Sequence, residues 1–258
     1  MIDEYQLDRL VGRLRAAGCV FAEEEAELLA GEAASVTELD RWVRRRVDGE
    51  PLETILGWAE FAGLRIAVSR GVFVPRRRSR VLVDEVIARA PHGAIVTELC
   101  CGTAAVSAAL LDSRPDVTVY ASDIDEQALS DARVNLRGRA TVVRGDLYSP
   151  LPHTLKGKVD VIVANAPYVP TEEIANMPPE ARDHESRAAL DGGHDGLDLH
   201  RRISVEARSW LRSGGSLIVE TSARQSTEDL RILAADGFDA RVVRSDEFDG
   251  TAVVGIAP

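Results

Sequence analysis

The residues best suited to chemistry follow the apolar run 161–164 and read Asn165-Ala166-Pro167-Tyr168. The side-chain oxygen of Asn165 and the backbone carbonyl of Ala166 can together accept the two N–H bonds of a planar NH2 group. Such a nitrogen is a weak nucleophile because its lone pair is delocalised, so the site would act by fixing it and stabilising developing positive charge. Tyr168 can pack against the planar group. The pattern indicates a site that orients an amide or ring NH2 and needs neither a metal nor a strong base.

Three other segments place small or acidic residues after apolar runs. The first is the loop 98–104, where Gly102 would let the backbone approach a ligand closely. Asp123 follows the next run, 21 residues after Gly102, and its carboxylate could accept hydrogen bonds from ribose hydroxyls. Asp146 follows a third run and could accept a hydrogen bond from an adenine amino group, while Leu147 covers the ring. These segments predict a nucleoside-containing cofactor. Asp125 is expected instead to cap the following helix.

The elements that must position these residues alternate along the chain from residue 90 onward. Short apolar or β-branched runs predict strands at Ala94–Leu99, Val117–Ser122, Ala140–Arg144, Val159–Ala164 and Ser216–Thr221. Helices are expected at Ala104–Leu111, Glu126–Leu136, Leu199–Leu211 and Thr227–Ala235. This alternation predicts a doubly wound α/β domain with a parallel sheet, in which ligands bind at the carboxyl ends of the strands.

Two further strands, Phe238–Arg244 and Thr251–Ile256, close the chain with a link too short for a crossover helix. We therefore expect this last pair to be antiparallel. A mostly parallel sheet with a reversed last strand is typical of class I S-adenosylmethionine (SAM) methyltransferases, which have a Rossmann-like sheet.

The first 50 residues carry only helical signals. Apolar residues at helical spacing predict a first helix, a second helix spans roughly 22–31, and Ser35 or Thr37 could cap a third. The apolar positions of the first helix are Ile2, Leu7, Leu10, Val11 and Leu14. The run Arg44–Arg46 is interpreted as a solvated face. Residues 58–74 alternate in short segments, as in a hairpin or connecting ribbon.

Composition excludes several classes of protein. A net charge of -11 argues against general attraction to nucleic acid, which depends on Lys and Arg. Three cysteines, two of them adjacent, form neither a disulfide framework nor a spaced zinc site, and Cys100 and Cys101 are interpreted as loop-packing residues. His153, His184, His194 and His200 are interpreted as loop or surface residues. No stretch approaches 18 apolar residues, so the protein is expected to be cytoplasmic, without a membrane partner.

These motifs resemble, over nearly the whole chain, those of the protein-(glutamine-N5) methyltransferases of the HemK/PrmC type. The segments that match are Pro51–Gly57, Phe73–Arg76, Glu98–Ala104, Asp123, Gly145–Leu147, Asn165–Pro170, Pro179–Glu185, Ala189–Gly193 and Asp195–Leu197. From the residues alone, 177–197 would be only a long functional loop over the active edge of the sheet.

The resemblance implies an enzyme that methylates the glutamine of the Gly-Gly-Gln loop in a peptide-chain release factor or a similar protein. It implies a helical substrate-docking domain over 1–50, a linker with a β-hairpin over 51–78 and a SAM-dependent methyltransferase domain over 79–258. SAM would be converted to S-adenosylhomocysteine without a metal. The residues that would hold SAM are Glu98, Cys100, Cys101, Gly102, Thr103, Ala104, Asp123, Ile124, Asp146, Leu147 and Asn165. The residues that would hold or orient the acceptor are Phe73, Pro75, Arg76, Asn165, Ala166, Pro167 and Tyr168.

The chain departs from the family pattern at three places, which indicates a divergent member. Ala166 stands where the family usually has Pro, and Cys100 and Ala104 stand where it usually has more glycine. After Arg76 the family usually continues Pro-Glu-Thr-Glu, whereas this chain has Arg-Arg-Ser-Arg over 77–80. The change over 77–80 lies beside the predicted acceptor site and bears on which substrate enters it, whereas Cys100 and Ala104 bear on how SAM is bound.

Three other functions remain compatible with the residues. One is a small-molecule amide or amine N-methyltransferase, because the departures fall near the expected substrate entrance. Another is a nucleic-acid adenine-N6 methyltransferase whose cluster Arg76–Arg80 contacts phosphates, although nucleic acid is an unlikely partner for so acidic a chain. The third is a non-catalytic SAM-binding scaffold, which would have no need of an NH2-orienting loop.

Overall fold

The computed structural model describes residues 4–258, so Ile2 of the predicted first helix lies outside the described residues. Three helices form an N-terminal bundle: α1 (Glu4–Ala16), α2 (Ala22–Glu32) and α3 (Val36–Val47). Apolar residues at helical spacing, such as Leu14, Leu29 and Val43, are fully buried between them. Ser35 caps α3, because its hydroxyl accepts a hydrogen bond from the Glu38 N–H at 3.2 Å, as the sequence predicts.

The interpretation of Arg44–Arg46 as a solvated face is wrong for Arg46. Its side chain is only 8% exposed and makes ion pairs with Glu25 of α2 and with Glu180, far along the chain. Helical periodicity cannot reveal which face a later segment will cover. Arg46 thus ties the bundle to the rest of the molecule.

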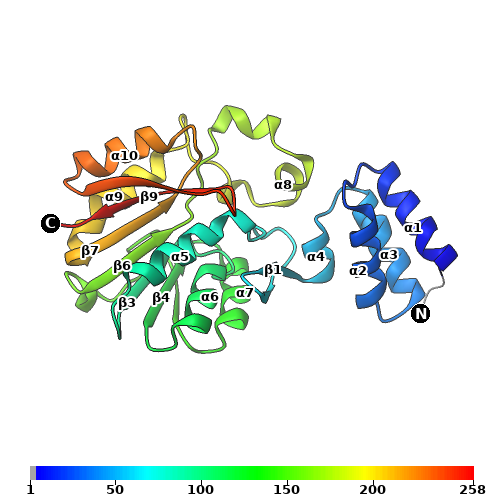
Figure 1. The fold of residues 1–258 in the computed structure, drawn as a ribbon, viewed down its shortest axis with the longest axis horizontal. Helices are drawn as coiled ribbons and strands as arrows, with labels where there is room; N and C mark the ends of the chain where they lie inside the picture. The colour runs from blue at the N-terminus through cyan, green and yellow to red at the C-terminus, as the bar shows by residue number, and fades with distance from the viewer. Residues whose placement is uncertain (1–3) are drawn as a thin grey trace.

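A short helix and a hairpin connect the two parts of the chain (Figure 1). The helix α4 (Leu52–Leu56) was not predicted, and its Ile55 packs into the core of the bundle. The hairpin strands β1 (Trp58–Phe61) and β2 (Leu64–Ala67) pair antiparallel, and residues 68–74, predicted as part of the same ribbon, form no strand. Asn135 holds the hairpin through both backbone groups of Ala67, at 2.7 and 3.0 Å.

The sheet domain has seven strands in the order β5-β4-β3-β6-β7-β9-β8. The strands are β3 (Ile95–Leu99), β4 (Thr118–Asp123), β5 (Thr141–Arg144), β6 (Val159–Ala164), β7 (Leu211–Glu220), β8 (Asp239–Ser245) and β9 (Gly250–Ile256). The pairings among β3 to β7 are parallel, whereas β9 runs antiparallel to both of its neighbours. This is the predicted doubly wound sheet with a reversed last strand. Most strands were placed to within one residue, but β7 begins at Leu211 rather than at Ser216.

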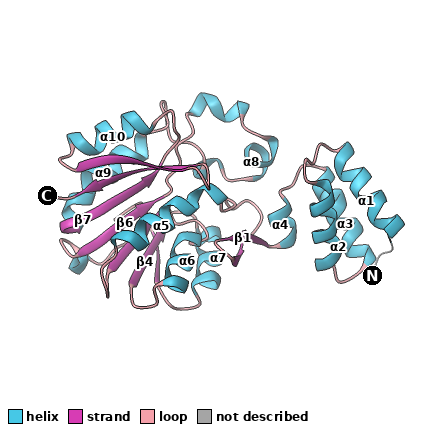
Figure 2. Ribbon diagram, in the orientation of Figure 1, coloured by secondary structure: helices cyan, strands magenta, loops and turns pink. Residues whose placement is uncertain are grey.

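Helices cover both faces of this sheet (Figure 2). The longer helices are α5 (Arg80–Arg89), α6 (Ala105–Ser113), α7 (Glu126–Leu136), α9 (Asp198–Trp210) and α10 (Ser226–Ala235). One face packs against α5, α6 and α7, and the other against α9 and α10. The sequence did not predict α5. Apolar side chains from both layers bury the strands, which explains their nearly continuous apolar runs.

Short helical turns interrupt several of the long connections, and all of them except the turn at His153–Leu155 lie in segments that reach the functional side of the sheet. They are η1 (Arg77–Ser79), η2 (His153–Leu155), η3 (Thr171–Asn176), α8 (Pro179–His184) and η4 (Arg187–Ala189). The predicted long loop 177–197 therefore contains α8 and η4. Figure 1 shows α8 on the side of the sheet domain that faces the bundle. No helix among residues 4–258 is long and apolar enough to cross a membrane.

Candidate active site

A cavity of about 370 Å³ lies at the carboxyl ends of β3 to β6. Its volume is within the range of ligand cavities, roughly 300–1,000 Å³. Every residue that the sequence predicted for the site lines this cavity, with the exception of Ala104. The residues brought together are Phe73, Pro75, Arg76, Glu98, Cys100, Cys101, Gly102, Thr103, Asp123, Ile124, Asp146, Leu147, Asn165, Ala166, Pro167 and Tyr168. Segment 177–190 supplies much of the remaining wall.

Asp123 joins two loops of the predicted cofactor site. Its Oδ2 accepts the Gly102 N–H at 2.8 Å, and its Oδ1 accepts the Asp125 N–H at 2.9 Å. Each carboxylate oxygen keeps a free lone pair, so the two oxygens can still accept hydrogen bonds from the two hydroxyls of a ribose. Burial raises the pKa of Asp123. Asp125 caps α7, as predicted, by accepting the Gln127 N–H at 2.8 Å.

Glu98 is the next-to-last residue of β3 and is only 4% exposed. Its Oε2 accepts the backbone N–H of Ser107 at 2.9 Å and also the Ser107 hydroxyl. Burial raises the pKa of Glu98 to about 7, against the hydrogen bonds from Ser107, which lower it. Glu98 therefore anchors the start of α6 to the sheet and also borders the cavity.

Ala104 does not line the cavity, contrary to its predicted cofactor contact. It is fully buried as the residue that precedes α6, with a left-handed φ of 56°, and Cys100 has a φ of 50°. A left-handed conformation costs a residue with a side chain roughly 1–2 kcal/mol, which explains why glycine suits both positions. Burial raises the pKa of both Cys100 and Cys101, so they remain thiols and act in packing.

The residues predicted to meet an adenine lie on the opposite rim. Leu147 is buried, and its carbonyl accepts the Ser122 hydroxyl at 3.0 Å. Asp146 is exposed, and its Oδ2 accepts a hydrogen bond from Arg202 at 2.6 Å. Ile124 is 52% exposed at the mouth of the cavity, where a bound ring could cover it. Leu147 and Ile124 beside the Asp146 carboxylate, whose Oδ1 is free, fit an adenine ring with its amino group.

The side chains of Asn165 and Tyr168 are held by residues of other elements, η1 and β7, rather than by their own loop. The Asn165 Nδ2 donates to the Ser79 hydroxyl at 3.1 Å, which leaves its Oδ1 available as an acceptor. The Tyr168 hydroxyl donates to Glu220 Oε1 at 3.3 Å. Burial raises the pKa of Tyr168, so it stays a neutral phenol. Ala166 is buried.

The predicted acceptor residues Phe73, Pro75 and Arg76 form the wall next to segment 177–190. Arg76 makes an ion pair with Glu185, whose carboxylate also accepts the Val74 N–H at 3.2 Å. The guanidinium lies 5.1 Å from the centre of the Phe73 ring. This pair links the two segments that border the acceptor side of the cavity.

The neighbouring basic run makes contacts within the chain rather than a free basic patch. Each of its arginines donates a hydrogen bond to an acceptor of another segment or helix turn: Arg77 to the Glu247 carbonyl, Arg78 to Glu220 and Arg80 to Asp84. These contacts compete with the phosphates that a nucleic-acid substrate would bring.

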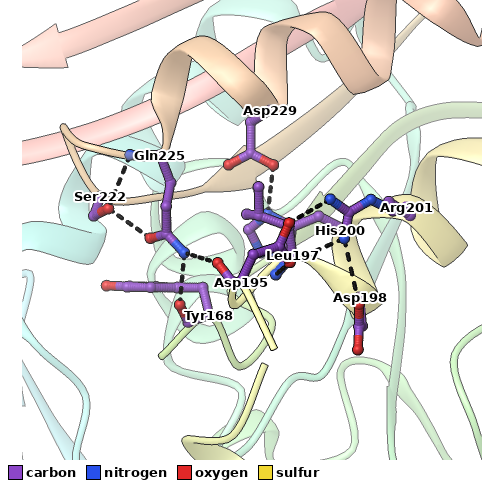
Figure 3. A network of polar contacts seen from close by, with 9 residues as sticks. All are labelled: Tyr168, Asp195, Leu197, Asp198, His200, Arg201, Ser222, Gln225 and Asp229. Carbon is purple, nitrogen blue, oxygen red and sulfur yellow. Dashed lines mark hydrogen bonds and ion pairs between the residues drawn. The ribbon is translucent and has the colours of Figure 1, made fainter. Parts of the chain in front are cut away.

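A polar network fixes the back of the Asn165–Tyr168 loop (Figure 3). The Gln225 side-chain amide donates to the carbonyls of Tyr168 and Asp195 at 2.9 and 3.0 Å. Its Oε1 lies 2.5 Å from the Ser222 hydroxyl. Gly196 packs so closely that a Cβ there would overlap the Tyr168 carbonyl oxygen. These contacts hold the backbone of the loop from the back, while Asn165 and Tyr168 line the cavity.

The interpretation of His200 as a loop or surface residue is wrong. It lies on α9, fully buried, with its Nδ1 2.7 Å from Asp229 of α10. Its ring packs edge-on to Tyr168 at a centroid distance of 6.3 Å. In Figure 3 His200 and Asp229 lie beside the Gln225 contacts, and His200 supports the same loop through its contact with Tyr168.

Sequence reasoning missed Ser79, Glu220 and Gln225. Glu220 ends a parallel strand after an apolar run, the same signal that identified Asp123. Ser79 and Gln225 gave no comparable signal, because their roles depend on contacts with Asn165 and Tyr168 across long stretches of chain. Within residues 4–258, no group of three or more His, Cys, Asp and Glu side chains could hold a metal ion; the prediction that no metal takes part stays a prediction.

The chain is similar to several known proteins. The family model of the methyltransferase small domain matches residues 64–183. A release factor glutamine methyltransferase of Geobacter sulfurreducens is 38% identical over 76% of this chain and 69% of its own length. A protein of the same name from Gloeobacter violaceus is 37% identical over 89% and 78%, and one from Mycolicibacterium smegmatis is 34% identical over 90% and 88%.

Among solved structures, a methyltransferase from Pyrococcus furiosus superposes with a TM-score of 0.56 at 16% identity, over 75% of this chain and 89% of that one. At this identity the likeness concerns the fold alone, and it confirms the predicted fold class.

Proposed function

This chain belongs to the release factor glutamine methyltransferases, and on that premise we propose that it methylates the side-chain amide nitrogen of a glutamine in a peptide-chain release factor. The observation that carries the proposal is the orientation of the Asn165 side-chain amide. Its Nδ2 is engaged by Ser79 while the residue borders the cavity, so its Oδ1 is the atom left to accept an N–H of an incoming amide.

The chain's own residues can orient such an acceptor without a base. Asn165 Oδ1 and the Ala166 carbonyl can accept the two N–H bonds of the amide, and the ring of Tyr168 bounds the plane of the group. Both acceptors become more favourable partners as the nitrogen acquires positive charge, so they stabilise the transition state more than the ground state. The contacts of Gln225 with the Tyr168 carbonyl and of Ser79 with Asn165 hold this loop before the acceptor arrives.

The residues at the strand ends fit SAM, which supplies an electrophilic methyl group when bound. Asp123 would accept the ribose hydroxyls, Asp146 the adenine amino group, and Leu147 with Ile124 would cover the ring. Glu98 borders the same cavity from the end of β3. S-adenosylhomocysteine would remain as the product, and the proposed chemistry uses no metal.

The test of the reaction is Asn165→Ala. We expect turnover to be abolished while the Kd for SAM, measured by calorimetry, changes by no more than severalfold, because Asn165 acts on the acceptor. A near-normal rate would remove Asn165 from the mechanism.

The acceptor is tested by offering labelled SAM separately to a purified release factor, duplex DNA and a small-molecule extract. Peptide mass spectrometry should place the label on a glutamine of the release factor. Label in DNA or in the extract would instead support one of the other enzymes, and SAM binding without any label would support a scaffold.

The N-terminal bundle is proposed to dock the protein substrate. Its supporting observation is the contact of Arg46 with Glu180 of α8, beside the wall of the cavity. Because Ile55 belongs to the bundle core, the truncation should remove residues 1–57. It should raise KM for an intact release factor much more than for a short glutamine peptide, whereas equal effects would contradict docking.

A further inference from the structure

Asn135 of α7 joins two segments that lie far apart in the sequence, the hairpin β1–β2 and the loop 98–104. Its Oδ1 accepts the Ala67 N–H at 2.7 Å, and its Nδ2 donates to the Ala67 carbonyl at 3.0 Å and to the Thr103 carbonyl at 2.9 Å. The partners fix the orientation of this amide, because a backbone N–H only donates and a carbonyl only accepts. Asn135 itself does not line the cavity, so the proposed reaction gives it no direct role.

The Thr103 carbonyl needs Asn135 because it lies just outside the next helix. Thr103 lines the cavity and is only 2% exposed. It precedes Ala104, the cap residue of α6, so its carbonyl lies outside the hydrogen-bond ladder of that helix. The Ser107 N–H, four residues later, donates to Glu98 instead, at 2.9 Å. A buried carbonyl without a partner is costly, so Asn135 supplies a hydrogen bond that the start of the helix does not provide.

The adjoining peptide group of the same loop is held from the other end of α7. Asp123, which ends β4 shortly before α7, accepts the Gly102 N–H at 2.8 Å. Asp123 and Asn135 therefore fix two successive residues of the loop, Gly102 and Thr103. Both of these residues line the cavity, so their backbone is set before a cofactor arrives. Such preorganisation lowers the cost of ordering the loop on binding.

The other contact of Asn135 is with the hairpin that connects the bundle to the sheet domain (Figure 1). Ala67 is the last residue of β2. Asp131, one turn before Asn135 on α7, holds the next part of this segment by accepting the Ser69 N–H and the Ser69 hydroxyl, both at 2.7 Å. Two side chains of α7 thus hold residues 67–69, and Asn135 reaches the loop 98–104 as well.

We propose that Asn135 is a positioning residue that holds the Thr103 carbonyl in the SAM site and couples this site to the hairpin. The inference rests on the proposed function, since it assumes that SAM binds in the cavity that Thr103 lines. Without the Asn135 amide, the loop loses one of the side-chain contacts that hold its backbone, and SAM binding has to order it. Because coupling between two sites is reciprocal, a bound cofactor that favours this loop geometry also strengthens the contact of Asn135 with Ala67.

The first test is the affinity for S-adenosylhomocysteine, measured by calorimetry. Asn135→Ala should raise the Kd about tenfold, which corresponds to about 1.4 kcal/mol. The KM for SAM should rise to a similar extent, while kcat at saturating SAM should stay within about twofold, because the residues that orient the acceptor are untouched. Asn135→Asp keeps the size of the side chain but places a carboxylate against the two carbonyls, so its Kd should rise at least as much. A Kd for Asn135→Ala within about twofold of the wild type would overturn the proposal.

The matched control is Asp131→Ala, which removes both hydrogen bonds to Ser69 and leaves the contacts of Asn135 in place. Asp131 is a buried side chain of the same helix and holds the same segment of the chain. Its substitution should leave the Kd for S-adenosylhomocysteine within about twofold of the wild type. A rise as large as that of Asn135→Ala would show that loosening the hairpin is sufficient, and would overturn the role of the Thr103 contact.

Amide hydrogen exchange followed by NMR tests the coupling in the opposite direction. Saturating S-adenosylhomocysteine should slow exchange of the wild-type Ala67 amide at least about fivefold more than that of the Ser69 amide, because Asn135 holds the first and Asp131 the second. Asn135→Ala should remove this difference. Equal slowing of the two amides in the wild type would overturn the coupling.

Wild-type binding separates this inference from the proposed function. If the wild type binds S-adenosylhomocysteine and Asn165→Ala loses turnover, a normal Kd in Asn135→Ala refutes the inference alone. If the wild type binds neither SAM nor S-adenosylhomocysteine, the cofactor of the proposed function is refuted. Circular dichroism establishes that each variant is folded; should both Asn135 variants fail to fold, the wild-type exchange of the Ala67 and Ser69 amides still decides the proposal.

Discussion

The buried contact of Arg46 offers the sharpest test of how the N-terminal bundle is held together. Its Nε and Nη2 meet the two carboxylate oxygens of Glu25 at 2.6 and 3.1 Å, and the Glu25 side chain is only 12% exposed. The same Nη2 lies 2.6 Å from Glu180, which is 48% exposed. One arginine therefore has one buried and one exposed partner, for which electrostatics predicts different energies.

Arg46→Met should lower the free energy of unfolding of the bundle by about 3–5 kcal/mol. The reason is that Glu25 keeps a buried charge without compensation, which is the main cost of breaking a buried pair. Glu180→Gln removes an ion pair near the surface and should cost only about 0–1 kcal/mol. The double variant Arg46→Met with Glu25→Met removes both buried charges and should recover most of the loss, because apolar residues of similar volume can replace such a pair.

The assay is hydrogen exchange of the amides of α1 to α3, which reports the opening free energy of the bundle separately from that of the sheet domain. Urea denaturation followed by circular dichroism gives the global value. Two results would refute the reasoning: a loss below about 1 kcal/mol in Arg46→Met, or a double variant as unstable as the single one. A cost for Glu180→Gln equal to that of Arg46→Met would show that the exposed contact dominates.

Three further predictions concern the site. Gly196→Ala should lower kcat at least about tenfold, because the new Cβ would overlap the Tyr168 carbonyl oxygen. The control Gly138→Ala has a similar φ of 74° but open space around it, so it should cost only about 1–2 kcal/mol of stability and leave kcat unchanged. Equal kcat values for the two variants would contradict the role of the contact. Glu98 has a pKa of about 7, above its ordinary value of 4.5, so the protonated form favours folding and its contribution is lost as the pH rises from 4.5 through 7. Urea titrations should therefore find Glu98→Gln more stable than the wild type by about 3 kcal/mol at pH 8 and equally stable at pH 4, and a constant difference would be inconsistent with this. Gln225→Glu should lower the melting temperature and cost about 1–3 kcal/mol, since a carboxylate would face the two carbonyls that the amide now serves; an unchanged melting curve would count against that role.

The sequence was sufficient for most of the sheet, because its strands are buried on both faces and appear as apolar runs. Asp123 and Asn165 could be placed at one edge for the same reason: the carboxyl ends of parallel strands meet there. Local capping by Ser35 and Asp125 was also predictable, since it depends on residues two or three positions away. What was predicted correctly thus depends on local spacing or on general sheet geometry.

The contacts that orient the site could not be predicted, because their partners lie far apart in the chain. Ser79 meets Asn165 86 residues later, and Arg78 meets Glu220 142 residues later. His200 and Arg46 looked like ordinary polar residues until α10 and α2 covered them. The left-handed backbone at Ala104, which turns that residue away from the cavity, has no local signature in a residue with a side chain.

The stretch 192–196 lies against the loop 165–170 with backbone on backbone. A Cβ on Gly192 would come within 2.7 Å of the Pro167 carbonyl oxygen, and the Val169 carbonyl accepts the Gly192 N–H at 2.9 Å. A side chain at Gly192 or Gly196 would displace the loop 165–170, so we expect substitutions at these glycines to be poorly tolerated. When copies of this gene diverge toward other acceptors, we expect the viable changes to accumulate in 73–80 and 177–190, on the side where side chains rather than main chain form the boundary.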